Sequence, residues 1–133
     1  HDGVSGARIE FGNHTKDTLA VTDGQDVCKL DDWHFQAKAV VLRRRADKCL
    51  SYFARHGRLL HAGTTGFESD RPVSIFMRGD RGEITSENGA KLTFHHPGIA
   101  GVRLNGDPVN AEPAGDDAVS MVVPPGRQGV ELV

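Results

Sequence analysis

The sequence predicts an all-β protein, an antiparallel β-sandwich of about ten short strands. Three observations support this prediction. Apolar and polar residues alternate over short runs, as they do in strands with one buried face. Gly, Pro, Asn and Asp interrupt these runs roughly every 8–12 residues, a spacing typical of sandwiches and barrels. The spacing of apolar positions that marks an amphipathic helix is almost absent.

Four strands are predicted in the first half of the chain, at residues 7–11, 18–22, 34–45 and 48–57. The third is apolar on both faces near its middle, which predicts a strand covered on both sides. The third and fourth form a hairpin whose turn, at 44–47, is charged. The alternation places the following residues on the apolar faces of these strands: Ile9, Phe11, Leu19, Val21, Phe35, Ala37, Ala39, Val41, Leu50, Tyr52 and Ala54.

The second half contains six more predicted strands, at 73–77, 83–86, 91–95, 101–104, 118–123 and 129–133. Asn105-Gly106 follows the fourth of them and suits the positive φ angles of a tight hairpin turn. Arg78-Gly79-Asp80 spells an adhesion tripeptide, but it is interpreted more simply as the turn between the first two. The residues expected to be buried between two sheets are Phe35, Val41, Phe53, Leu92, Leu104, Met121 and Leu132.

Length and composition indicate one globular domain spanning residues 1–133. Hydrophobic residues make up 38% of the chain and charged residues 26%. A net charge of −2 argues against a dedicated nucleic-acid-binding protein. No run of about 18 apolar residues is present, so no membrane-spanning helix is expected. Because the chain begins HDGVSG, without Met, it is expected to be a fragment or a processed product of a larger protein.

The stretch HFQAKAVVLRRRADKCLSYFARHGRLL, at residues 34–60, is rich in basic side chains. Arginine binds carboxylates through paired hydrogen bonds, and sugar rings pack on flat aromatic side chains, so an acidic polysaccharide is a candidate ligand. The alternative is a β-hairpin with a charged turn, in which the aromatic residues belong partly to the core. The candidate substrate-binding residues are Trp33, His34, Arg44, Arg45, Tyr52, Arg55, His56 and Arg58.

No catalytic or metal-binding motif is evident. The chain contains no HxH, HExxH, CxxC or GxSxG spacing, so no catalytic residue, metal ligand or cofactor is predicted from these motifs. His95 and His96 are adjacent and would point to opposite faces of a strand. One alternative remains open: a free N-terminal His1 offers an amine and a ring nitrogen to copper, with His95 or His96 as a second ligand.

Cys28 and Cys49 are the two cysteines of the chain. They are compatible with one disulfide bond or with two buried, reduced thiols, because two cysteines do not define a disulfide framework.

From about Thr22 to Val133 the order of these segments resembles the carboxy-terminal β-sandwich of bacterial heparinase II/III-like polysaccharide lyases. The resemblance rests on TDGQDV, WHFQAKAVVLRR, SYFARHGRLLHAG, RPVSIFMRGDRGEI, GVRLNGDPV and VVPPGRQGVELV. Such lyases join an α-helical toroid to β-sandwich sheets and cleave uronate-containing chains by β-elimination. No motif of this chain matches their catalytic residues, which lie mostly before this segment.

The resemblance therefore implies an accessory, non-catalytic β-sandwich that braces the catalytic part of a lyase or contacts its substrate. The implied partners are an acidic polysaccharide and the remainder of the parent lyase, with no nucleic acid and no membrane. The implied location is secreted or periplasmic, a setting in which a bond between Cys28 and Cys49 is expected. A free-standing module that binds acidic glycans is the alternative function, and a small copper enzyme that uses His1 is another.

Overall fold

The computed structural model describes residues 5–10, 15–46 and 48–133. Strands and their turns account for these residues, and no helix occurs among them, so the predicted all-β fold is confirmed. Within the described part of the chain there is consequently no helix long and apolar enough to cross a membrane. Phe11 lies outside the described residues.

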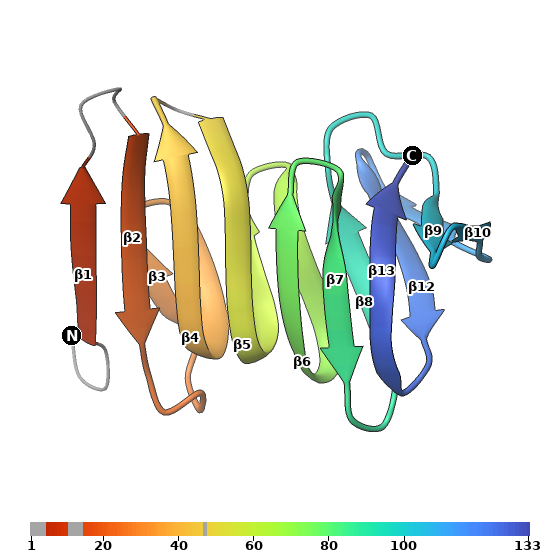
Figure 1. Cartoon of the computed structure of the whole chain (residues 1–133), viewed down its shortest axis with the longest axis horizontal. Helices are drawn as coiled ribbons and strands as arrows, with labels where there is room; N and C mark the ends of the chain where they lie inside the picture. The colour runs from red at the N-terminus through yellow and green to blue at the C-terminus, as the bar shows by residue number, and fades with distance from the viewer. Residues whose placement is uncertain (1–4, 11–14, 47) are drawn as a thin grey trace.

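In the described part of the chain, thirteen strands form one continuous antiparallel sheet that folds over on itself into a sandwich (Figure 1). Their bounds are β1 (Ser5–Glu10), β2 (Thr15–Val21), β3 (Cys28–Leu30), β4 (Trp33–Arg45), β5 (Lys48–Ala62), β6 (Thr65–Arg78), β7 (Arg81–Ser86), β8 (Ala90–His95), β9 (Val102–Leu104), β10 (Asp107–Pro108), β11 (Glu112–Gly115), β12 (Ala118–Val123) and β13 (Gly126–Leu132).

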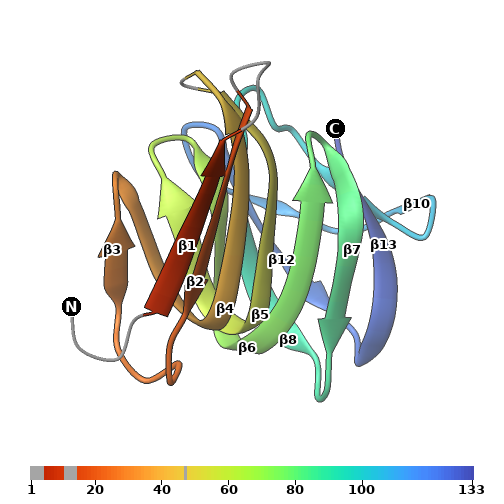
Figure 2. The ribbon, with the colours of Figure 1, turned by 60° about the vertical axis from the view of Figure 1, so that its left-hand side comes forward.

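Three long strands, β4, β5 and β6, belong to both layers of the sandwich. The front layer runs in the order β1-β2-β4-β5-β6-β7-β13-β9-β10. The back layer contains the other halves of the same three strands, with β3 beside β4 and with β8, β12 and β11 following β6. Figure 2 shows the three strands curving from one layer to the other at the end that lies lowest in the view. We call this the bend end and the opposite one the open end.

The bend depends on small and irregular residues at the middle of each long strand. The pairing of β4 with β5 shifts between Gln36 and Ala37, and His56 in β5 has a positive φ of 49°. A Cβ atom on the adjacent Gly57 would lie 2.7 Å from the Cβ of Ala37, closer than two carbons pack. Only glycine therefore lets the two chains approach this closely on the inside of the bend.

The core lies between the two layers and contains most of the residues predicted for it. Phe35, Leu92, Leu104, Met121 and Leu132 are buried, which confirms their prediction.

The prediction was wrong for Val41 and Phe53, which are only half-buried on the outer face of the front layer. The bend explains the difference for Val41: Ala37 is the last inward residue of β4 before it, and Val40 is the next, so the inward positions shift by one. Ala39, also expected inward, is half-buried for the same reason. Phe53 faces outward because Tyr52 and Ala54 on either side of it face the core.

An apolar row crosses the outer face of the front layer. Leu19 of β2, Val41 of β4, Phe53 of β5 and Phe76 of β6 lie side by side in register. Leu19 is 40% exposed and Phe76 is 44% exposed. Both faces of β4 are thus apolar, as the sequence indicates, but within the described residues no element covers the outer one. We call these four residues the front apolar row.

Two predicted turns are confirmed. Asn105 and Gly106 have φ angles of 52° and 87° between β9 and β10. Arg78 pairs with Arg81 across a two-residue turn, so Arg78-Gly79-Asp80 is part of a tight hairpin.

The disulfide prediction was wrong, because both thiols are free. Cys28 lies opposite Phe35 in the back layer, whereas Cys49 lies opposite Arg44 in the front layer.

Candidate functional site

The bend separates the eight predicted site residues into three places. Trp33, Arg44, Arg45 and Tyr52 belong to the open end of the sandwich, where β4 starts in one layer and finishes in the other. His34 is exposed on the outer face of the back layer, opposite His61. The residues at the bend end are Arg55, His56 and Arg58, all exposed.

The aromatic residues of the predicted site form core rather than a sugar platform. Trp33 is 4% exposed and Tyr52 is 5% exposed. Their ring centroids lie 6.4 Å apart, and Tyr52 also stacks on Phe67 with centroids 6.4 Å apart. The alternative interpretation of these two residues, as part of the core, is therefore the correct one.

Arg44 holds the two layers together at the open end. Its Nη2 atom donates hydrogen bonds to Asp31 Oδ2 at 2.9 Å and to Thr18 Oγ1 at 3.2 Å. Asp31 precedes β4 in the back layer, whereas Thr18 belongs to β2 in the front layer. Only 15% of the Arg44 side chain is exposed, so this guanidinium stabilises the fold and is not presented to a ligand.

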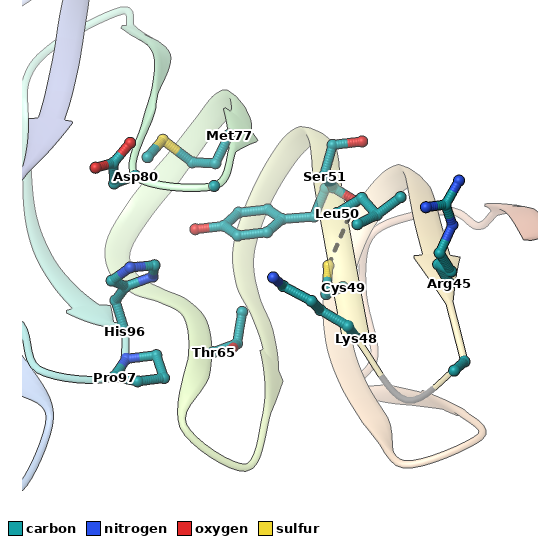
Figure 3. Close-up of a pocket in the computed structure, with 13 residues that line it drawn as sticks. Arg45, Lys48, Cys49, Leu50, Ser51, Thr65, Met77, Asp80, His96 and Pro97 are labelled. Carbon is teal, nitrogen blue, oxygen red and sulfur yellow. Dashed lines mark hydrogen bonds between the residues drawn. The ribbon is translucent and has the colours of Figure 1, made fainter. Parts of the chain in front are cut away.

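A pocket of about 820 Å³ opens between the layers at the same end. It lies within the size range of small-molecule sites, roughly 300–1,000 Å³. Its walls come from the β4–β5 turn, the start of β6, the β6–β7 turn and the segment after β8. Figure 3 shows Asp80, His96 and Pro97 on one side of this open-end pocket and Arg45 and Leu50 on the other.

Two cations line the open-end pocket. Arg45 and Lys48 are exposed, and neither lies within ion-pairing distance of a described carboxylate. Asp80 is the described acid of the lining, and Lys48 extends from β5 toward the side where His96 lies (Figure 3). The lining can therefore bind an anion without first breaking an ion pair.

The buried groups beside these cations are held in their protonated states. Burial raises the pKa of the Cys49 thiol to about 11, against the opposing charge of Arg44, and the Sγ atom lies 3.4 Å from the Ser51 carbonyl oxygen. Burial likewise raises the pKa of the Tyr52 phenol far above its usual value. Near neutral pH neither group is a base or a nucleophile, and the phenol keeps its proton.

Metal binding has no support in the described residues. No group of three or more His, Cys, Asp or Glu side chains there has an arrangement that could hold a metal ion. His1, on which the copper alternative depends, lies outside the described residues.

The bend end has a shallower recess of about 400 Å³, lined in part by His56, Arg71 and Glu87. Arg71 donates a hydrogen bond to the Asn88 carbonyl oxygen at 3.1 Å, which ties this side chain to the fold. The exposed cations of this end are separated from the open-end pocket by the front-layer half of β5. The basic stretch of the sequence is thus two separate surfaces.

Sequence reasoning missed the residues that complete the open-end pocket. Lys48, Asp80 and His96 come from three segments that are distant in the chain. Lys48 begins a predicted strand, and Asp80 and His96 follow predicted strands, but only the order of strands in the two layers brings Asp80 and His96 beside Lys48. No protein-family model matches this chain, and no curated protein matches it either.

Proposed function

We propose that this chain is a non-catalytic β-sandwich that binds an acidic, uronate-containing glycan at its open end and serves as an accessory domain of a polysaccharide lyase. The observation that carries the proposal is the open-end pocket, a concavity of ligand size with two cations, Arg45 and Lys48, that have no described carboxylate partner.

The lining fits the chemistry of a uronate residue. A uronate carries one carboxylate, which Arg45 or Lys48 attracts, and several hydroxyls, which need both donors and acceptors. His96, Thr65 and Asp80 supply such groups around the same pocket. Asp80 also disfavours a second anion close to it, so we expect a preference for one carboxylate per sugar over densely charged ligands.

The accessory setting is supported by the front apolar row as well as by the resemblance to lyase β-sandwiches. An uncovered apolar strip on a sheet face usually packs against other protein. We infer that the remainder of the parent lyase covers this face and that the chain acts in the secreted or periplasmic space. The alternative, a free-standing module, uses the same pocket but leaves the apolar row in solvent.

Calorimetric titration with a tetragalacturonate tests the binding site. The double variant Arg45→Ala, Lys48→Ala should lose about tenfold or more in affinity, as expected when charged hydrogen bonds to a carboxylate are removed. The matched control is Arg55→Ala, Arg58→Ala, which removes two exposed arginines at the bend end and should bind like the parent chain. A neutral oligosaccharide of equal length should not compete. Equal losses in both double variants would refute the pocket as the site.

Absorbance measurements test the non-catalytic part of the proposal. β-Elimination creates a C=C bond that absorbs in the ultraviolet, so the pure chain should give no absorbance increase on heparin, alginate or hyaluronan. A steady increase that disappears in the Arg45→Ala, Lys48→Ala variant would show instead that the chain is itself a lyase.

A further inference from the structure

Three histidines lie in register across the outer face of the back layer, near the open end. His34 of β4 is opposite His61 of β5, His61 is opposite Gly66 of β6, and Gly66 is opposite His95 of β8. We call His34, His61 and His95 the histidine row. Lys29 of β3 lies opposite His34 and extends the row by one strand. The histidine motif search along the sequence missed this arrangement, because its members are far apart in the chain.

Gly66 brings two of the rings together. It has a φ of 130°, and a Cβ atom there would lie 2.0 Å from the Leu60 carbonyl oxygen, so no other residue fits without a shift of the backbone. No side chain of Gly66 therefore stands between the imidazoles of the two neighbouring strands. The ring centroids of His61 and His95 are 4.1 Å apart, with 36° between the ring planes.

His61 is the least satisfied member of the row. Its Nε2 atom is buried and has no hydrogen-bond partner among the described residues. Burial lowers the pKa of His61, and the charges of His95 and His34 act in the same direction. A hydrogen bond to the Gly63 backbone and the charge of Glu68 oppose them. A protonated His61 would therefore present an Nε2–H group that lacks an acceptor.

Among the described residues, Glu68 is the carboxylate that contacts the row. On β6, Glu68 Oε2 lies 3.0 Å from His95 Nε2. On one side of His61 lie His34 of β4 and, one strand further, Lys29 of β3. On the other side of the row, the residue of β12 opposite His95 is the uncharged Ala118. When the imidazoles are protonated, the row holds cations side by side: His34 and His61 lie on adjacent strands, about 4.8 Å apart, and the ring centroids of His61 and His95 are 4.1 Å apart.

We propose that the histidine row is a second anion-binding surface, which takes the carboxylate or sulfate groups of an acidic polymer when the medium is mildly acidic. An oxyanion beside His61 and His95 would offset the repulsion between the two charged rings. The row is separate from the open-end pocket, so this proposal does not depend on the proposed function.

Imidazole resonances of the full chain, followed by NMR, test the proposal with two probes, inorganic sulfate and a tetragalacturonate. At about pH 5.5, at least one probe should shift the signals of His61 and His95, because a bound anion favours the protonated rings and so opposes the lowering of the His61 pKa by burial. Affinity should fall by about tenfold between about pH 5.5 and about pH 7.5, because binding is linked to proton uptake. The two probes distinguish sulfate from carboxylate as the preferred group.

Two variants with opposite expected effects keep the test decisive. His61→Gln should abolish the pH-dependent binding, whereas Glu68→Gln removes the competing carboxylate and should tighten it. His56→Gln, an exposed histidine at the bend end, is the control and should change nothing. The proposal is overturned if neither probe shifts the row, if affinity is the same at both pH values, or if Glu68→Gln weakens binding. Loss of the row's response in the Arg45→Ala, Lys48→Ala variant would also overturn it, by placing the ligand in the pocket.

Discussion

The two ends of the three long strands differ in packing, although β4, β5 and β6 supply both. At the bend end the strands pass from one layer to the other, and Ala37 and Gly57 pack so closely that no further atom fits between them. At the open end the strands stop, the layers separate, and a pocket of about 820 Å³ lies between them. A bent strand can therefore hold the two layers tightly together at its bend and still leave a ligand-sized pocket between them where it ends. Only a few residues separate the two places.

The bend end should be the more sensitive to added volume, which Gly57→Ala tests. The new Cβ would lie 2.7 Å from that of Ala37 on the inside of the bend, so we expect a loss of about 2 kcal/mol in the free energy of unfolding, measured by urea denaturation. Gly101→Ala is the control: its Cβ would meet only Val133 Cγ2, at 3.7 Å, and the change should stay within about 0.5 kcal/mol. Equal effects would show that the bend is not tightly packed.

At the open end the fold depends on charge, which Arg44→Ala tests. Loss of the hydrogen bonds to Asp31 and Thr18 should lower the free energy of unfolding by about 1.5 kcal/mol, because this guanidinium is largely buried. Arg55→Ala, at the bend end, removes an exposed arginine and should cost about 0.5 kcal/mol or less. If the Arg44 variant is as stable as the Arg55 variant, the bridge between the layers is not a stabilising contact.

A pH difference should also distinguish the ends. Burial lowers the pKa of His61 in the folded chain, so folding favours the neutral ring. The stability that this supplies is present above the ordinary histidine pKa of about 6.5 and is lost as the pH falls below it. Urea midpoints should therefore decrease between about pH 7.5 and about pH 5.5, and His61→Gln should reduce the decrease. His56→Gln, at the bend end, should leave it unchanged.

The smallest effect is expected between the two ends, on the front apolar row. Phe76→Thr should lower the free energy of unfolding by about 0.5 kcal/mol, because the ring is 44% exposed and loses mainly its cross-strand contact with Phe53. Ile75→Thr, one residue earlier and buried in the core, should cost about 3 kcal/mol. A large loss from Phe76→Thr would mean that the outer face contributes to the isolated fold.

The sequence predicts the strands well because alternation and turn residues are local signals. Asn105-Gly106 is an example, since both positive φ angles follow from the residue types. The assignment of the inward face fails for Val41, because a bend in the middle of a strand shifts the alternation and no turn residue announces it in β4. It fails for Phe53 because the inward Tyr52 and Ala54 place the residue between them on the outer face. Which face of a strand the second layer covers depends on the arrangement of the whole sheet.

The candidate site was harder to predict than the fold. Arg45 was identified because it is basic and next to a turn. Lys48 pairs with it across the same turn, whereas His96 joins them only through the order of strands. Arg55 and Arg58 were grouped with it because they are close in the sequence, yet β5 carries them to the opposite end. Trp33 and Tyr52 show the same limit, since an aromatic residue at a strand end faces the core or the solvent according to tertiary packing.

Because β4, β5 and β6 belong to both layers, we expect the two layers to unfold together. Opening the back-layer half of β5 releases Leu60, and the backbone motion reaches Gly57 and then Ala54 in the front layer within a few residues. We therefore expect one cooperative unit, in which the amide hydrogens of the three strands exchange by global unfolding at a common free energy. The short strands at the margins, β10 and β11, are joined to the sheet by few pairs and should exchange earlier.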